Sequence, residues 1–461
     1  MPTKEREEAE EMGGREEETA AKKPRRLIEH STDVLPLHSG NGRAQLKGRR
    51  DVQGWNSCGL TLSSCSDDAA RLIDLSIEQV IGWFGDPYQT AVLSSEADPC
   101  CVVPYCIMLW LKYLGSSAGE DDPVIIETIG KAEKALSERA HSEREILLFT
   151  CLKELSEGKF EESLLLVEDY LLQYPSDAMG LKLQNDLCYF TGQNFRMRDG
   201  VARCLPDLDD ETRFYGYMLG MYAFVLEEAF DYDKAQQYAQ RALQKNSKDV
   251  WAIHAMAHTL EMQVDETGQY DQALSVYDMQ IEFEGFQVGN RWEAVWPLVS
   301  RCYAGGLRGA CDDCLEWMKH AGDHRLAFND AHIALAVGAS GNLVIQRETL
   351  AAWEKFCLDR KDDSRASLVN LRNVCIPLLR AVLAYRSCRF DDCVNELLRV
   401  RYQLYMIGGS NAQREVFFLL LIRAGLASKN KKFISLVKQL VNEKMATDTQ
   451  SRMMKRLLVS V

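Results

Sequence analysis

The chain has 461 residues and a formal net charge of −14, with 46% hydrophobic and 26% charged residues. This acidic balance excludes a typical nucleic-acid-binding surface, which needs clustered lysine and arginine, and it favours basic or neutral partners. Its 15 cysteines follow no disulfide framework, and it has neither a signal-peptide core nor an uncharged apolar run near about 18 residues, so we expect a cytoplasmic protein without membrane contact.

The first 50 residues differ in composition from the rest. Residues 1–50 are rich in Glu, Lys, Arg and Gly and contain no Phe, Trp or Tyr. Such a segment buries too little apolar surface to offset the entropy of ordering, so we expect a disordered charged N-terminal tail. The composition becomes globular near Trp55, and we expect a helical solenoid over residues 51–461.

Apolar residues recur at helical spacing through almost all of this domain, and no segment shows the sustained alternation typical of strands. After a first helix through Ala69–Val80, the spacing predicts helices over residues 100–114, 123–139, 143–157, 160–173, 177–191, 194–205, 211–229, 231–245, 249–264, 270–283, 328–337, 343–358, 365–384, 390–406, 411–427 and 430–443. We therefore expect an all-α protein.

One helical hairpin signature recurs four times. Its turns lie at Gly158, Gly192, Phe230 and Gly268, which are 34, 38 and 38 residues apart. This is the period of tetratricopeptide repeats, in which small residues let neighbouring helices approach closely. Antiparallel helix pairs of this kind stack into a right-handed α-solenoid. The predicted organisation comprises the clearest repeats in 146–283, an irregular segment in 284–327, and further helix pairs in 328–443.

The first helices of successive repeats face the same side of a solenoid, its concave groove. Polar and aromatic side chains on that side predict a surface that binds a protein or peptide partner. The expected lining residues are Asn185, Tyr189, Tyr222, His254, His258 and Glu261.

Two of these residues could also bind a metal or a ligand. His254 and His258 are four positions apart, so they share a helix face, and Glu261 continues it. Ala255 follows the first histidine where a zinc-protease motif has Glu, so that motif is not met. We favour hydrogen bonding of both imidazoles within the groove, and we assign no cofactor, catalytic residue or metal ligand.

A polar cluster begins the helix predicted near 328. It contains Asn329, Asp330 and His332, and we expect Asn329 or Asp330 to serve as an N-cap. Just before it, His320 and His324 follow a Cys311-x-x-Cys314 pair. The gap between the two pairs is too short for a zinc finger, so we favour packing over zinc binding.

A second polar cluster contains Ser410, Asn411 and Arg414. The preceding Gly408-Gly409 could form an anion-binding nest together with Arg414. The alternative that we favour is a helix end at the diglycine, followed by a capping box of Ser410 and Gln413.

The stretches that carry a family resemblance are Leu164–Lys182, Met197–Arg203, Val250–Met262, Phe328–His332 and Gly408–Arg414. They resemble the family of tetratricopeptide repeat protein 38, from about Trp55 nearly to the C-terminus. The resemblance implies a cytosolic helical-repeat protein of poorly defined function. It also implies additional residues around 262–291, and our hypothesis is that this chain comes from an alternative transcript or an imperfect gene model.

Two functions follow from these patterns. The leading hypothesis is a scaffold or adaptor that binds a peptide or protein in the concave groove, with self-association as a further option. The alternative is a metal- or small-molecule-dependent enzyme whose site contains His254, His258, Asp330 and His332. No nucleotide-binding or nucleophile motif supports the alternative.

Overall fold

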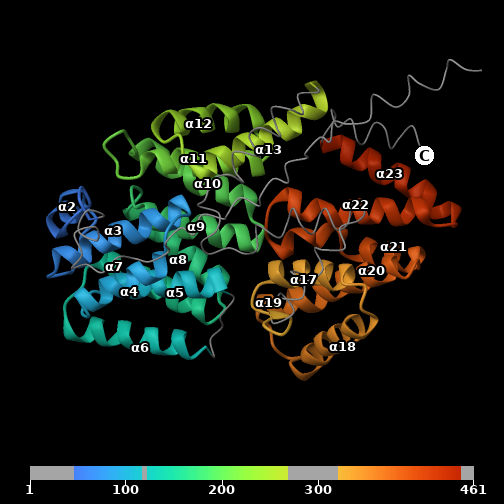
Figure 1. Cartoon of the computed structure of the whole chain (residues 1–461), viewed down its shortest axis with the longest axis horizontal. Helices are drawn as coiled ribbons and strands as arrows, with labels where there is room; N and C mark the ends of the chain where they lie inside the picture. Colours follow the sequence, from blue (N-terminus) through green and yellow to red (C-terminus); the bar gives the residue numbers. More distant parts are fainter. Residues whose placement is uncertain (1–45, 117–121, 268–319, 448–461) are drawn as a thin grey trace, which may run out of the picture. The chain divides into compact units, whose positions relative to one another are not determined.

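The computed structural model describes residues 46–116, 122–267 and 320–447, which all belong to one compact unit, Val34–Val461. Throughout these ranges the regular elements are helices, and no strand occurs among them (Figure 1). The predicted all-α fold of antiparallel helix pairs is confirmed. The helix predicted over 270–283, the Cys311 and Cys314 pair, and most of the predicted tail lie outside the described residues.

The helices that precede residue 268 follow one another with short connections. They are α2 (Val52–Ser57), α3 (Asp67–Gly82), α4 (Pro87–Ala97), α5 (Val103–Ser116), α6 (Pro123–Glu138), α7 (Glu143–Ser156), α8 (Phe160–Gln173), α9 (Ala178–Thr191), α10 (Asn194–Cys204), η1 (Leu205–Asp207), α11 (Tyr215–Glu228), α12 (Tyr232–Lys245) and α13 (Val250–Thr267).

The helices that follow residue 319 form a second series. They are α17 (Ala327–Ala339), α18 (Leu343–Asp359), α19 (Ala366–Asn370), η5 (Leu371–Cys375), α20 (Ile376–Arg386), α21 (Phe390–Val400), η6 (Arg401–Ile407), α22 (Asn411–Ala427) and α23 (Lys431–Thr447).

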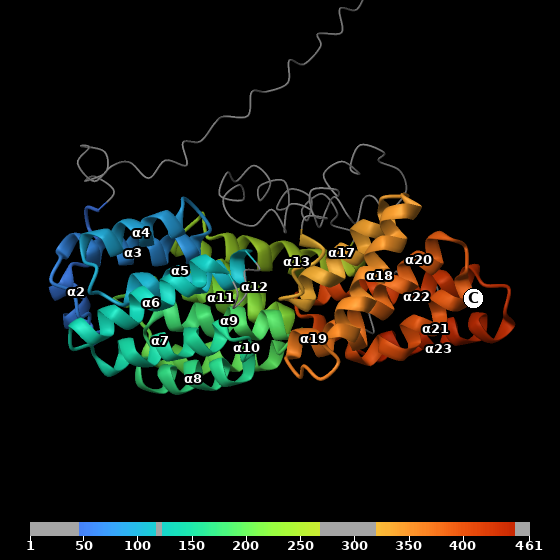
Figure 2. The same cartoon turned by 90° about the horizontal axis from the view of Figure 1, so that it is seen from below.

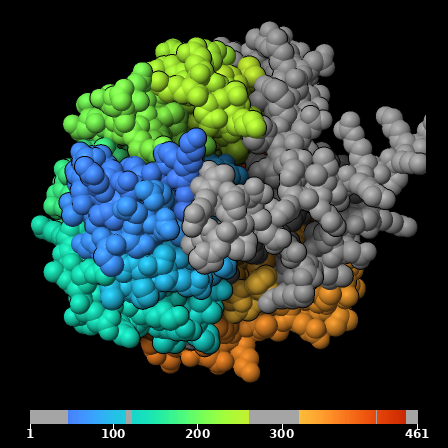
Figure 3. Space-filling model, turned by 60° about the vertical axis from the view of Figure 1, so that its left-hand side comes forward, coloured from blue at the N-terminus to red at the C-terminus, as the bar shows by residue number. Residues whose placement is uncertain are grey.

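Consecutive helices pack as pairs, as the repeat spacing predicts. Helix α7 packs on α8, α11 on α12 and α20 on α21, and α13 then packs on both members of the preceding pair (Figure 2). Within α12 the buried residues are Ala235, Ala239 and Ala242. Because these side chains are small and share one face, α12 lies close to its neighbours. The space-filling view shows the side chains of successive helices in direct contact (Figure 3).

Two hydrophobic cores meet at α17. Leu326 and Phe328 belong to the core built by the helices that precede residue 268. Ala327 and Ala331 belong to the core formed with α20, α21, α22 and α23. Alternate faces of one short segment therefore contact both series of helices.

Three local features differ from the predicted elements. Helices α2 and α4 were not predicted, because α2 has only six residues and the α4 sequence PYQTAVLSSEA lacks a clear apolar period. The predicted helix 365–384 contains a wide π turn, η5, directly before α20 and Pro377. Proline has no N–H and its ring clashes with the carbonyl four positions earlier, so a wider turn fits there. The predicted helix 390–406 becomes a 3₁₀ helix, η6, after Val400.

One helical stretch in the described ranges, Ala366–Arg386, is long and apolar enough to cross a membrane by length and composition. It contains Arg372, Arg380 and Arg386, and 56% of its apolar window is buried within the protein. Leu371, Val374 and Leu379 are fully enclosed in the second core. The apolar character of this stretch is therefore used in packing.

Candidate functional site

Two of the polar residues that the sequence analysis named, Asn411 and Arg414, lie around Glu228, the last residue of α11. Its side chain is 2% exposed. The carboxylate oxygen Oε2 accepts hydrogen bonds of 2.9 Å from Nδ2 of Asn194 and 2.9 Å from the backbone N–H of Asn411. Nδ2 of Asn411 donates to the Glu228 carbonyl at 2.8 Å. We call Glu228, Asn194, Asn411 and Arg414 the Glu228 junction.

Arg414 completes this junction from the first turns of α22. Its Nη2 donates to Oδ1 of Asn411 at 2.7 Å. Its Nη1 donates to the carbonyls of Gly408, at 3.1 Å, and of Gly409. The guanidinium is buried and committed to its own helix start, so the predicted role of Arg414 in an anion site is not supported by its contacts.

The diglycine before α22 is also fully engaged. Gly408 and Gly409 have φ angles of 74° and 78°. The Gly408 N–H donates to the Tyr405 carbonyl at 2.9 Å, and the Gly409 N–H donates to the Tyr189 carbonyl at 2.8 Å. A side chain at Gly408 would overlap the Phe190 carbonyl. The Gly409 N–H thus links α9 to the start of α22, and because both N–H groups have carbonyl acceptors they do not form an anion-binding nest.

The predicted capping box at the start of α22 is confirmed. Ser410 Oγ accepts from the Gln413 N–H at 3.2 Å, and Gln413 Oε1 accepts from the Ser410 N–H at 2.8 Å. Tyr189 adds a bond from α9, because its hydroxyl donates to the same Oε1 at 2.8 Å. The cap is thus shared by two helices far apart in the sequence.

His254 and His258 lie beside the Glu228 junction on α13. Their ring centroids are 4.5 Å apart, and His254 packs edge-on against Phe224 at 5.6 Å. Burial lowers the pKa of His254 well below its usual value, and the neighbouring His258 lowers it further. His254 is therefore neutral near pH 7.

The pKa values of the two charged groups in the junction, Glu228 and Arg414, shift in opposite directions. Burial raises the pKa of Glu228, while Arg414, the Asn411 N–H, His258 and Asn194 act to lower it. Burial likewise lowers the pKa of Arg414, against the attraction of Glu228. The low-polarity surroundings thus penalise both charges, and the hydrogen bonds offset that cost.

The remaining predicted groove residues lie in different surroundings. Asn185 is 1% exposed, so it belongs to the interior of the protein. Tyr222 is half-buried and packs edge-on against Tyr238, with ring centroids 4.6 Å apart. Glu261 is in α13, and its side chain lies outside the described part of the structure. Tyr189, His254 and His258 are therefore the predicted groove residues that come together, around Phe224.

The cluster at the start of α17 is arranged differently from the prediction. Neither Asn329 nor Asp330 is the N-cap, so that prediction is wrong: α17 begins after Leu326 without a side-chain cap. Asp330 Oδ1 instead pairs with His324 Nδ1 at 2.9 Å. Burial raises the pKa of Asp330, and its bond with His324 opposes the shift.

His332 lies on another face of α17. Its Nδ1 contacts the Phe328 carbonyl at 2.6 Å, and its ring is 4.2 Å from the Phe328 ring. Burial lowers its pKa to about 4, against the bond to Phe328. Asp330 and His332 thus have separate partners, and the structure gives them no common site.

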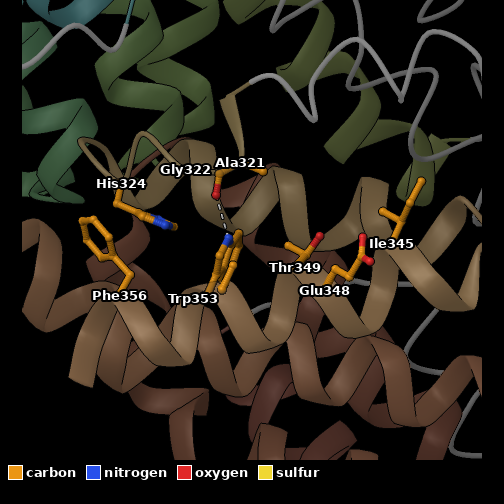
Figure 4. A pocket seen from close by; sticks show the side chains of 9 residues that line it. Ala321, Gly322, His324, Ile345, Glu348, Thr349, Trp353 and Phe356 are labelled. Atoms are coloured by element: carbon orange, nitrogen blue, oxygen red, sulfur yellow. Dashed lines mark hydrogen bonds between the residues drawn. The ribbon is translucent and has the colours of Figure 1, made fainter. Parts of the chain in front are cut away.

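His324 and its neighbours form a cavity of about 360 Å³ beside α18 (Figure 4). Trp353 is its buried wall and donates from Nε1 to the Ala321 carbonyl at 2.7 Å. The His324 ring lies 4.5 Å from that of Phe356 and 5.4 Å from that of Trp353. The full lining is Ala321, Gly322, His324, Ile345, Glu348, Thr349, Ala352, Trp353 and Phe356.

Sequence reasoning named Asp330 but missed its partner and the cavity. His324 was considered only as a zinc ligand with a cysteine pair. Its backbone φ of 49° lies in the left-handed region, which residues other than glycine rarely adopt. No pattern in the sequence predicted this conformation. Within residues 46–116, 122–267 and 320–447, no three His, Cys, Asp or Glu side chains are placed to hold a metal ion.

The described cysteines are free thiols, and most of them are buried. Burial raises the pKa of Cys151 to about 12, with a lowering contribution from its bond with Ser163. Burial also raises the pKa of Cys375 well above its usual value. Such thiols pack as small apolar side chains and are poor nucleophiles.

Comparison with known proteins gives a distant match. No family model matches the chain. Among solved structures, it is similar to a Rap protein complexed with competence and sporulation factor, with 12% identity. The match covers 78% of this chain and 96% of that chain, with a TM-score of 0.28.

Proposed function

We propose that this chain is a helical-repeat adaptor of the tetratricopeptide type, related to the tetratricopeptide repeat protein 38 family, that binds a protein or peptide partner through residues of its helical domain 51–461. The supporting observation is the engagement of the polar residues at the start of α22. The side chains of Ser410 and Gln413 form the capping box of α22, and Gln413 also accepts a bond from Tyr189. The Arg414 side chain donates to the Gly408 carbonyl. Groups used in this way fix helices and are not free to activate a substrate.

The proposed partner surface includes His254 and His258, which are half-buried on one face of α13 next to Tyr189 and Phe224. Half-buried aromatic and imidazole side chains suit recognition, because they supply apolar area and a polar edge at small entropic cost. The helices beneath them are fixed by the Glu228 junction, so the surface is formed before binding.

The experiment is selection from a random peptide library on immobilised full-length protein. We expect saturable binding of a subset of peptides, and we expect His254→Ala to weaken the binding of those that contact α13. The control is His141→Ala, whose ring nitrogens contact the Arg139 and Cys100 carbonyls in another part of the protein. If no peptide is enriched over an empty support, the adaptor proposal fails.

The second candidate function is a metal- or small-molecule-dependent enzyme. It is favoured by one observation, the 4.5 Å separation of the His254 and His258 ring centroids on one face of α13. Elemental mass spectrometry of untagged protein tests it. Stoichiometric metal in the wild type that is lost in His258→Ala would favour the enzyme, and unchanged metal content in that variant would count against a site there.

A further inference from the structure

The cavity beside α18 has a feature that the adaptor proposal does not use: a buried carboxylate that orients a histidine toward it. Asp330 is 1% exposed, and its Oδ1 pairs with His324 Nδ1 at 2.9 Å. Its other oxygen, Oδ2, is buried and has no hydrogen-bond partner within the described ranges. His324 itself lines the cavity with a backbone φ of 49°. A strained backbone held by a buried partner is a typical arrangement for a side chain with a binding role.

We infer that the α18 cavity binds the side chain of a lysine or arginine carried by a partner peptide. This inference rests on the proposed function, because it specifies the chemistry of the partner that the adaptor holds.

Two side chains of the cavity lining, Glu348 and Thr349, offer hydrogen-bond acceptors. His324 Nδ1 and Asp330 Oδ1 are 2.9 Å apart, so the carboxyl group fixes the orientation of the ring. Because Nδ1 of His324 is paired with Asp330, the other ring nitrogen, Nε2, is the one that is left for a ligand. Glu348 contributes a carboxylate, and the Thr349 hydroxyl can also accept. No Lys or Arg is among the lining residues of this cavity in the described part of the chain.

The apolar groups suit the stem of a long cationic side chain. Ile345, Ala352, Trp353 and Phe356 share the cavity wall, and Figure 4 shows Phe356 and Trp353 on the side of His324. Aromatic ring faces attract cations, and aliphatic stems pack on apolar surface while the charged end reaches an acceptor. Arg360 of the protein itself lies 4.0 Å from the Phe356 ring centroid, so an incoming cation has to use the part of this ring that lines the cavity.

Size and charge agree with this occupant. A cavity of about 360 Å³ is at the small end of ligand sites, which span roughly 300–1,000 Å³. It suits one side chain better than a cofactor. The net charge of −14 attracts a basic peptide over longer distances.

The test uses labelled nonapeptide pools with a fixed central residue and random flanking positions that exclude Lys, Arg and Cys. The central residue is Lys, Arg, norleucine or Glu, and binding to the full chain is measured by fluorescence polarisation. We expect the Lys and Arg pools to bind about 10-fold more tightly than the norleucine pool, which has a similar stem without charge. We expect the Glu pool to bind most weakly.

Two variants and one control locate the effect. Glu348→Gln removes the exposed carboxylate at the cavity and should reduce the Lys preference about 5-fold or more. Phe356→Leu keeps an apolar side chain but removes the ring, and it should also reduce the preference. Glu354→Gln makes the same charge change on α18 outside the cavity, at a surface pair with Arg380, and should leave the preference unchanged.

The outcomes separate the inference from the adaptor proposal. Equal binding of the Lys and norleucine pools, or a Lys preference that Glu348→Gln and Phe356→Leu leave intact, overturns the cation site while peptide binding still supports an adaptor. The absence of binding by every pool and by a fully random library overturns both.

Discussion

The Glu228 carboxylate at the end of α11 accepts a 2.9 Å hydrogen bond from the backbone N–H of Asn411, which lies 183 positions later at the start of α22. The same oxygen accepts from Asn194 at the start of α10. One carboxylate oxygen thus joins three helices, and it does so among buried groups where water cannot replace a lost bond. This contact links α22 to the earlier helices, together with the bonds that join Tyr189 to Gly409 and Gln413.

Replacing Glu228 should destabilise the protein strongly. Glu228→Ala leaves the Asn411 N–H without its acceptor and Arg414 without its carboxylate neighbour, so we expect a loss of about 3–5 kcal/mol in the free energy of unfolding. Glu228→Gln keeps an acceptor oxygen and should lose about 1–3 kcal/mol. Urea denaturation followed by circular dichroism measures both. Glu162→Ala, an exposed glutamate of α8, is the control and should change stability little. Equal stability of Glu228→Ala and this control would show that the junction is not needed for packing.

The diglycine contact should be sensitive to a single methyl group. Gly408 has φ 74° and ψ −162°, and a Cβ there would overlap the Phe190 carbonyl. We expect Gly408→Ala to lower stability by more than about 3 kcal/mol, because backbone strain and a backbone clash add. Gly341→Ala is a control for a glycine at positive φ: its φ is 66°, and no atom lies within 4 Å of the added carbon.

Gly341→Ala should therefore cost only the strain of a left-handed alanine, about 1–2 kcal/mol. Thermal unfolding of the two variants side by side makes the comparison. If both lose the same stability, the contact between Gly408 and Phe190 contributes nothing beyond backbone conformation.

Asp249 should make stability depend on pH. Burial raises its pKa to about 7, although the N–H groups of Ala252 and Trp251 act to lower it. Between about pH 4, the usual value for an unfolded aspartate, and pH 7 the folded protein therefore binds a proton more readily than the unfolded chain. The stability contributed by this group falls as pH rises through that window, and the full penalty is present above pH 7.

The substitution Asp249→Asn keeps a capping oxygen and removes the charge. We expect it to stabilise the protein at pH 8 by about 2–4 kcal/mol, with the difference shrinking toward zero near pH 4. Urea denaturation of wild type and variant across this range tests the sign. A variant that is less stable than wild type by the same amount at every pH would exclude an ionised, buried Asp249 as the cause.

Local features of this fold were predictable because local forces decide them. The spacing of apolar residues predicted a helix over 160–173, and α8 has those limits. The Ser410 and Gln413 capping box followed from two residue types at a fixed separation. Helix α4 was not predicted because its apolar residues lack helical spacing, and tertiary packing stabilises it as a helix.

The arrangement of the candidate sites was much less predictable. Glu228 looks like any surface glutamate of a helix, and its burial depends on partners 34 and 183 positions away. Asp330 looked like an N-cap because such residues usually cap helices at that place. It pairs instead with His324, since the chain before α17 turns through a left-handed residue and returns the imidazole to the helix. A contact that forms because the chain turns back on itself, such as that of His324 with Asp330, produces no periodic pattern in the sequence.

The most direct test of the adaptor account is the selection of peptides from a random library on the immobilised full-length protein, followed by titration of each selected peptide in solution. The account predicts saturable binding that competes among selected peptides and that urea-unfolded protein does not show. An absence of enrichment over an empty support, for folded protein verified by circular dichroism, would contradict it.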